Sequence, residues 1–158
     1  MDTNVEKIGF IGLGRMGRPM ATNLVKKGFD LIVLDINADA VAALVAAGAK
    51  AGTSVADIAR QCGIVITMLP SSVEVEQVAA EIFTNAAKGT LLMGMSTIDP
   101  LATDRLNAAA IKHGLTLVDA PVGRLAEHAD RGESLFMVGA SDADFARVKP
   151  LMASPQVP

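Results

Sequence analysis

Three glycines near the start of the chain have the spacing of a phosphate-binding turn. Gly12, Gly14 and Gly17 directly follow a short apolar run, and residues 16–27 have a helical pattern. Gly12 would allow a tight turn, Gly14 would let the backbone approach a pyrophosphate, and Gly17 would let the helix pack on the strand. The free N–H groups of the helix start would face the anion. The alternative is an ordinary strand-to-helix turn.

An acidic residue ends the next predicted strand. Asp35 follows the apolar residues 31–34 and lies 18 positions after Gly17, which is close to the expected place of the acid that binds the adenosine ribose. No Arg or Lys occurs between Asp35 and Ala49. A carboxylate without a nearby cation would repel a 2′-phosphate, so the sequence favours NAD over NADP. The alternative role for Asp35 is a cap on the helix that starts near Asn37.

Two further strand ends carry candidate contacts. Leu69 and Pro70 would pack on the adenine or ribose side of the cofactor, or would simply end their strand. Ser96 and Thr97 would donate hydroxyl groups to a ribose or a substrate carboxylate. Their alternative role, which the residues alone favour, is to cap the helix that begins at Asp99 and Pro100.

A cation follows the predicted strand 115–119. Arg124 lies beside Gly123, a residue that permits close approach of the backbone. A guanidinium pairs with carboxylate, phosphate or sulfonate groups. The segment therefore predicts an anionic substrate at Gly123 and Arg124, with a solvated surface arginine as the equal alternative.

The remaining reactive side chains indicate no chemistry. His113 stands at a helix end, His128 lies in a polar loop, and neither has neighbours at metal-ligand spacing, so no metal site is predicted. Cys62, the only cysteine, precedes an apolar strand and is interpreted as a core residue.

The elements that must position these residues alternate along the chain, which predicts an α/β fold with a doubly wound, mostly parallel sheet of the Rossmann type. In such a sheet ligands bind at the carboxyl ends of the strands. We expect strands at residues 7–12, 31–34, 50–51, 64–69, 90–95, 115–119 and 135–138, and helices at residues 16–27, 38–47, 54–61, 71–83, 99–112 and 142–152.

Composition narrows the class of protein. The chain has 158 residues, 51% of them hydrophobic, but only 3% aromatic, so aliphatic side chains must form the core. The net charge of −3 and the absence of a basic stripe argue against nucleic acid as a partner. No apolar run has the length of a membrane span. A single cysteine and no signal-like start favour a cytoplasmic protein.

Four segments resemble one known family. GFIGLGRMGRPMATNLVKKG, ITMLP, MSTIDP and DAPVGR are similar to segments of the β-hydroxyacid dehydrogenases, the group that contains 3-hydroxyisobutyrate dehydrogenase and tartronate semialdehyde reductase. The resemblance implies that Arg15 and Met16 contact NAD together with the glycines and Asp35. It also implies cofactor contacts for Leu69, Pro70 and Thr97.

The chain departs from that family in three respects. Members usually carry DAPVSGG where this chain has Gly123, Arg124 and Leu125, a variant similar to sulfolactaldehyde reductase, whose arginine binds the sulfonate. Gly94 replaces a frequent acid. The family also continues into a helical second domain with the catalytic lysine and much of the dimer interface, so no catalytic residue is assigned in this chain.

These implications define the expected organisation. Residues 1–152 are expected to form an NAD-binding domain and residues 153–158 a truncated tail. The full-length protein is expected to be a homo-oligomeric, NAD-dependent oxidoreductase of small 3-hydroxy acids or semialdehydes. The isolated chain should bind NAD weakly and turn over little. The alternative is a non-catalytic NAD-binding or interaction module.

Overall fold

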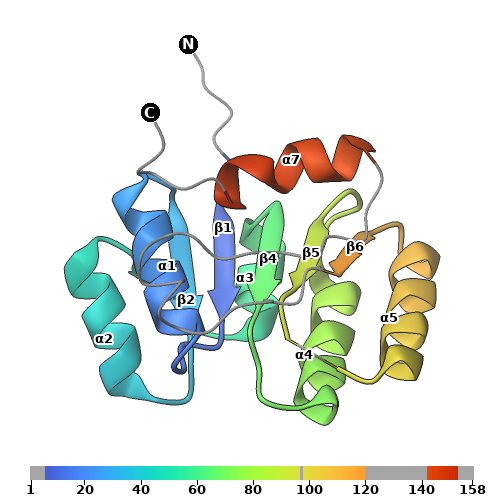
Figure 1. Cartoon of the computed structure of the whole chain (residues 1–158), viewed down its shortest axis with the longest axis horizontal. Helices are drawn as coiled ribbons and strands as arrows, with labels where there is room; N and C mark the ends of the chain where they lie inside the picture. Colours follow the sequence, from blue (N-terminus) through green and yellow to red (C-terminus); the bar gives the residue numbers. More distant parts are fainter. Residues whose placement is uncertain (1–5, 97, 120–141, 153–158) are drawn as a thin grey trace.

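A parallel sheet forms the centre of the molecule (Figure 1). The computed structural model describes residues 6–96, 98–119 and 142–152, and within them the sheet has six strands in the order β3-β2-β1-β4-β5-β6. Every neighbouring pair is parallel, which confirms the predicted α/β fold. The strands are β1 (Ile8–Ile11), β2 (Leu31–Leu34), β3 (Lys50–Ala51), β4 (Ile64–Thr67), β5 (Leu91–Gly94) and β6 (Thr116–Asp119).

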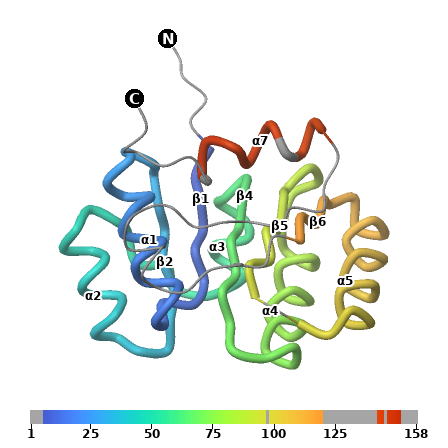
Figure 2. The backbone as a smooth tube through the Cα atoms, viewed as in Figure 1, coloured from blue at the N-terminus to red at the C-terminus, as the bar shows by residue number. Residues whose placement is uncertain are grey.

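Helices cover both faces of this sheet, as Figures 1 and 2 show. One buried cluster joins the sheet to α1 (Gly17–Lys26), α2 (Ala38–Ala47) and α7 (Asp142–Met152). The other joins it to α3 (Val55–Gln61), α4 (Ser72–Asn85) and α5 (Pro100–Lys112). Because both faces are covered, β1 and β4 are buried along their whole length, which explains their continuous apolar sequences.

Four of the helices begin at a side-chain cap. The caps of α2, α3, α4 and α5 are Asn37, Ser54, Ser71 and Asp99, each of which accepts a hydrogen bond from a backbone N–H of the first turn. The predicted elements are found within about two residues of their expected bounds. The predicted strand at residues 135–138 lies outside the described residues.

Helix α7 lies across the amino ends of the strands, at the top of Figure 1. The guanidinium of Arg147 donates to both carboxylate oxygens of Glu6, just before β1. It also donates to the carbonyl oxygens of Gly63, before β4, and Gly89, before β5, at 3.0 and 2.9 Å. One side chain thus connects α7 to three strand starts and leaves the opposite, carboxyl edge of the sheet open for a site.

Candidate functional site

The glycine turn between β1 and α1 is closely packed at two of its three glycines. Gly12 has φ +105°, and a Cβ there would lie 2.1 Å from the carbonyl oxygen of Met68. A Cβ on Gly17 would lie 2.0 Å from the carbonyl oxygen of Gly12. Neither site has room for a side chain, so both glycines are required by the fold itself.

Gly14 differs from the other two glycines. A Cβ at this position would meet nothing within 4 Å, and its φ is not positive. The protein therefore gives no reason for glycine at residue 14, whereas an approaching ligand would. This open position is where a pyrophosphate would come close to the backbone.

The start of α1 lacks the side-chain cap that α2 to α5 possess. Its N-cap residue, Met16, makes no side-chain hydrogen bond to the first turn, and that turn contains no acid. The N–H groups of a helix start need partners, and the helix dipole favours an anion there. The structure therefore fits a phosphate-bearing cofactor at this helix end.

Asp35 connects the end of β2 to the glycine turn. One carboxylate oxygen accepts a hydrogen bond from the backbone N–H of Leu13, and the other accepts one from Asn37 at 2.8 Å. The side chain is half-buried. Because Asn37 caps α2, the alternative role of Asp35 as the helix cap is wrong. Asp35 instead lies against the turn on which the pyrophosphate would rest.

A groove of about 470 Å³ begins at Gly14 and follows the exposed side of α1. Arg15, Arg18 and Lys26 give it three cations, which suit a polyanion. Arg18 was not predicted as a site residue, although two arginines three positions apart at a helix start were a visible signal. The other lining residues are Leu13, Pro19, Thr22 and Asn23.

The loops after β4 and β5 are joined by a hydrogen bond between predicted site residues. The N–H of Leu69 donates to the hydroxyl oxygen of Ser96 at 2.8 Å. Ser96 is buried, and Asp99 caps α5, so the favoured prediction that Ser96 is a helix cap is wrong. The cap directly precedes the first helical residue, Pro100, and Ser96 lies too early for that position. Pro70 lies beside Leu69 and is exposed.

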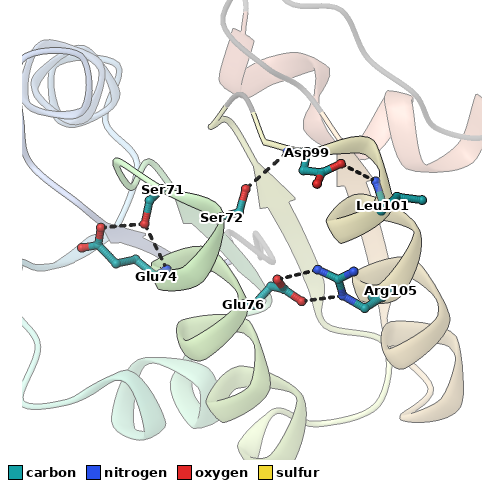
Figure 3. A network of polar contacts seen from close by, with 7 residues as sticks. All are labelled: Ser71, Ser72, Glu74, Glu76, Asp99, Leu101 and Arg105. Carbon is teal, nitrogen blue, oxygen red and sulfur yellow. Dashed lines mark hydrogen bonds and ion pairs between the residues drawn. The ribbon is translucent and has the colours of Figure 1, made fainter.

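The first turns of α4 and α5 are tied together beside these loops (Figure 3). The N–H of Asp99 donates to the hydroxyl of Ser72 at 3.3 Å. One turn further on, Arg105 donates to both carboxylate oxygens of Glu76 at 3.0 and 2.9 Å. These hydrogen bonds lower the pKa of Glu76. The pairings hold two helix starts in place at the carboxyl edge of the sheet.

Three predicted site residues lie outside the described part of the chain: Thr97, Gly123 and Arg124. Their cofactor and substrate contacts stay predictions. The described residues bring the glycine turn, Asp35, Leu69 and Ser96 to the same edge of the sheet, because each follows the carboxyl end of a parallel strand.

Cys62 and His113 are structural. Cys62 is buried, and desolvation raises the pKa of its thiol to about 11, which disfavours a nucleophile. The Nδ1 atom of His113 lies 2.9 Å from the carbonyl oxygen of Ala109, and its ring stacks on Phe83 with centroids 6.0 Å apart.

Among residues 6–96, 98–119 and 142–152, no group of side chains suits a metal ion, and no helix is long and apolar enough to cross a membrane.

The chain matches known proteins along most of its length. The family described as the NAD-binding domain of 6-phosphogluconate dehydrogenase matches residues 7–155. The chain is 41% identical over 148 residues to the mitochondrial 3-hydroxyisobutyrate dehydrogenase of Rattus norvegicus, covering 92% of this chain and 44% of that protein. It is 42% identical over 150 residues to the NAD-dependent L-serine dehydrogenase of Pseudomonas aeruginosa, covering 93% and 50%.

A solved structure agrees with these sequence matches. The 3-hydroxyisobutyrate dehydrogenase of Mycobacterium tuberculosis, solved with L-serine, superposes with a TM-score of 0.89 at 31% identity and covers 94% of this chain and 51% of that one. The chain thus spans about half the length of the relatives that it matches.

Proposed function

The chain belongs to the family of the NAD-binding domain of 6-phosphogluconate dehydrogenase and binds NAD, and from this premise we propose that it is the cofactor-binding part of a 3-hydroxy acid dehydrogenase. The observation that carries the proposal is the combination at the carboxyl edge of the sheet. An uncapped helix start and an open Gly14 lie beside a carboxylate at the end of β2.

Each described residue has a distinct task in this proposal. The N–H groups at the start of α1 bind the pyrophosphate, and Arg15 with Met16 lies over it. Asp35 keeps its hydrogen bond from Leu13 and accepts others from the ribose hydroxyls, since a carboxylate has about four acceptor sites. Leu69 and Pro70 contact the adenosine side of the cofactor, and Thr97 makes a further contact with the cofactor. The bound nicotinamide supplies hydride chemistry.

The proposed substrate is a short 3-hydroxy acid or its semialdehyde. Gly123 and Arg124 would bind its anionic group, with Ser96 nearby, and a guanidinium suits a sulfonate as well as a carboxylate. Relatives named 3-hydroxyisobutyrate and L-serine dehydrogenases support the class of substrate. The PVGR segment supports a sulfonate, as in a sulfolactaldehyde reductase.

We propose that the proton donor comes from the part of the relatives' length that this chain does not match, since the chain covers 50% and 44% of the two dehydrogenases named above. Hydride transfer to a carbonyl leaves an alkoxide that must be protonated, and we assign no such donor to the described residues of this edge. Residues 1–152 alone would then bind NAD without appreciable turnover. We propose a homo-oligomer for the complete enzyme, and a cytoplasmic location, although several relatives are named as mitochondrial.

Calorimetric titration with NAD and NADP tests the cofactor site. The chain should bind NAD more tightly than NADP. Asp35→Asn should weaken NAD binding roughly 10- to 100-fold, which corresponds to the loss of a hydrogen bond to a charged group. It should also reduce the ratio between the affinity for NAD and the affinity for NADP. Asp39→Asn is the matched control, because Asp39 is an exposed acid on the first turn of α2.

Three outcomes would contradict the proposal. They are absence of NAD binding by the folded chain, equal affinity for NADP, and unchanged affinity after Asp35→Asn. Turnover of a semialdehyde panel by the chain alone, followed as NADH oxidation, would instead contradict the external proton donor.

Activity of the complete enzyme with Arg124→Ala tests the substrate site. The loss of activity should be larger for a substrate with a sulfonate than for a neutral aldehyde.

A further inference from the structure

Thr67, Gly94 and Asp119 form one row across the sheet. Thr67 of β4 is in register with Gly94 of β5, and Gly94 is in register with Asp119 of β6. Side chains of one row in parallel strands point to the same face. This is the face of Val65 and Leu92, which pack against α4 and α5. A hydroxyl and a carboxyl group thus flank a residue that has no side chain.

The space beside Gly94 is a small cavity. A Cβ at Gly94 would meet nothing within 4 Å, and the cavity has a volume of about 10 Å³. That volume is about the minimum that one water molecule needs. The polar residues that line it, besides Gly94, are Thr67, Ser96, Thr103 and Asp119, and the apolar ones come from β5, β6, α4, α5 and the loop before α5.

Thr67 gives this cavity a buried polar group in need of a partner. Its side chain is 1% exposed, and its hydroxyl has no hydrogen-bond partner among the described residues. A buried hydroxyl without a partner costs free energy, and native proteins usually supply one. The facing Asp119 is half-buried, and desolvation raises the pKa of its carboxyl group. Both groups would gain from a shared partner.

We propose that one ordered water molecule occupies the cavity beside Gly94 and bridges the hydroxyl of Thr67 to the carboxyl group of Asp119. Strands two apart are separated by about 9–10 Å, so these two short side chains need an intervening molecule. A buried water requires two to four polar partners, and Ser96 and Thr103 offer further hydroxyl groups. The water then lies beneath the loop in which Ser96 accepts the hydrogen bond from Leu69.

A crystal structure of the chain that resolves ordered water tests the site directly. The proposal expects a density peak within about 3.2 Å of both Thr67 Oγ1 and an oxygen of Asp119. A cavity without a peak, or a side chain that fills it, would overturn the proposal. Neither result depends on NAD binding, so this test and that of the proposed function can fail separately.

Three substitutions at Thr67 and Gly94 test the same site in solution. Thr67→Val should lower the Tm by about 2–4 °C, because the water loses a partner. Gly94→Ala should also lower the Tm, since a methyl group displaces the water and leaves the hydroxyl of Thr67 unpaired. Gly94→Ser should leave the Tm unchanged, because its hydroxyl takes the place of the water as a partner.

The decisive result is a change of sign. In the Gly94→Ala background, where the water is already displaced, Thr67→Val should raise the Tm, because it removes an unpaired buried hydroxyl. If Thr67→Val raises the Tm, or leaves it unchanged, in the otherwise unaltered chain, the hydroxyl has no water partner and the proposal fails. An equal loss in both backgrounds would also overturn it.

Discussion

At the scale of single residues, the three glycines of the turn do separate jobs. A Cβ at Gly12 or Gly17 would run into backbone oxygens at 2.1 and 2.0 Å, whereas one at Gly14 would meet only open space. Gly12→Ala and Gly17→Ala should therefore lower the Tm by many degrees or prevent folding. Gly14→Ala should leave the Tm within about 2 °C, the range of a surface substitution, and weaken NAD binding at least tenfold.

Thermal unfolding and calorimetric titration of the three variants check this division. Gly52→Ala is a useful control for crowding away from the site, because a Cβ there would lie 2.7 Å from the side chain of Ile58. Loss of stability in Gly14→Ala, or full affinity for NAD in that variant, would contradict the assignment of Gly14 to the ligand.

Asp119 makes stability depend on pH in a defined direction. Desolvation raises the pKa of this carboxyl above its ordinary value of 3.8, so the folded chain holds the proton more tightly than the unfolded one. Stability due to this group is then highest below pH 3.8 and falls as the pH rises through the folded pKa. Asp119→Asn should be more stable than the parent at pH 7, and the difference should vanish near pH 3. Urea unfolding of both proteins across this range checks the sign.

The sequence predicted the types of residue at the site better than their partners. Asp35 and the glycines were predicted from spacing, because β1, α1 and β2 follow one another in the chain. The role of Ser96 was not, since its donor is the N–H of Leu69 in the loop after the neighbouring strand β4, 27 positions away. Thr67 was missed for the same reason: its environment depends on the register of β4 with β5 and β6.

At the scale of elements, helix starts were predictable because caps are local. Asn37, Ser54 and Asp99 each accept hydrogen bonds from residues two or three positions away, so the local sequence places the helix starts. The cap residue itself was less certain, because the sequence offered Asp35 and Ser96 for α2 and α5, where the caps are Asn37 and Asp99. The docking of α7 was not predictable. It depends on Arg147 meeting Glu6, which is 141 positions away, and two backbone carbonyls.

Removing Arg147 should loosen α7 from the amino edge of the sheet. Arg147→Met retains much of the aliphatic stem but loses the hydrogen bonds to Glu6, Gly63 and Gly89. The free energy of unfolding should fall by about 1–2 kcal/mol, a value reduced because the ion pair is partly exposed. Amide exchange near residues 63 and 89 should accelerate.

Arg105→Met is the matched control for that change. It breaks a bidentate pair with Glu76 that lies on the surface between two helices, where solvent screens the charges. A loss of stability as large as that in Arg147→Met would show that the contacts of Arg147 with backbone carbonyls add nothing.

At the scale of the whole molecule, the binding site exists only in the folded chain. The turn after β1, the end of β2 and the loops after β4 and β5 come together through the sheet. NAD at 100 times its Kd should stabilise the fold by about 2.7 kcal/mol, which raises the Tm by roughly 5–10 °C for a chain of this size. Differential scanning fluorimetry checks the shift, with NADP giving a smaller one. Equal shifts would argue against Asp35 as the discriminating group.

The uncapped start of α1 has a practical consequence for anyone who works with the chain. Its backbone N–H groups bind an anionic group of suitable shape, and they do not distinguish a nucleotide phosphate from a free anion. Inorganic sulfate and phosphate should therefore compete for the same place. Affinities measured in phosphate buffer will be underestimates, and crystals grown from ammonium sulfate will tend to exclude the nucleotide that a soak is meant to introduce.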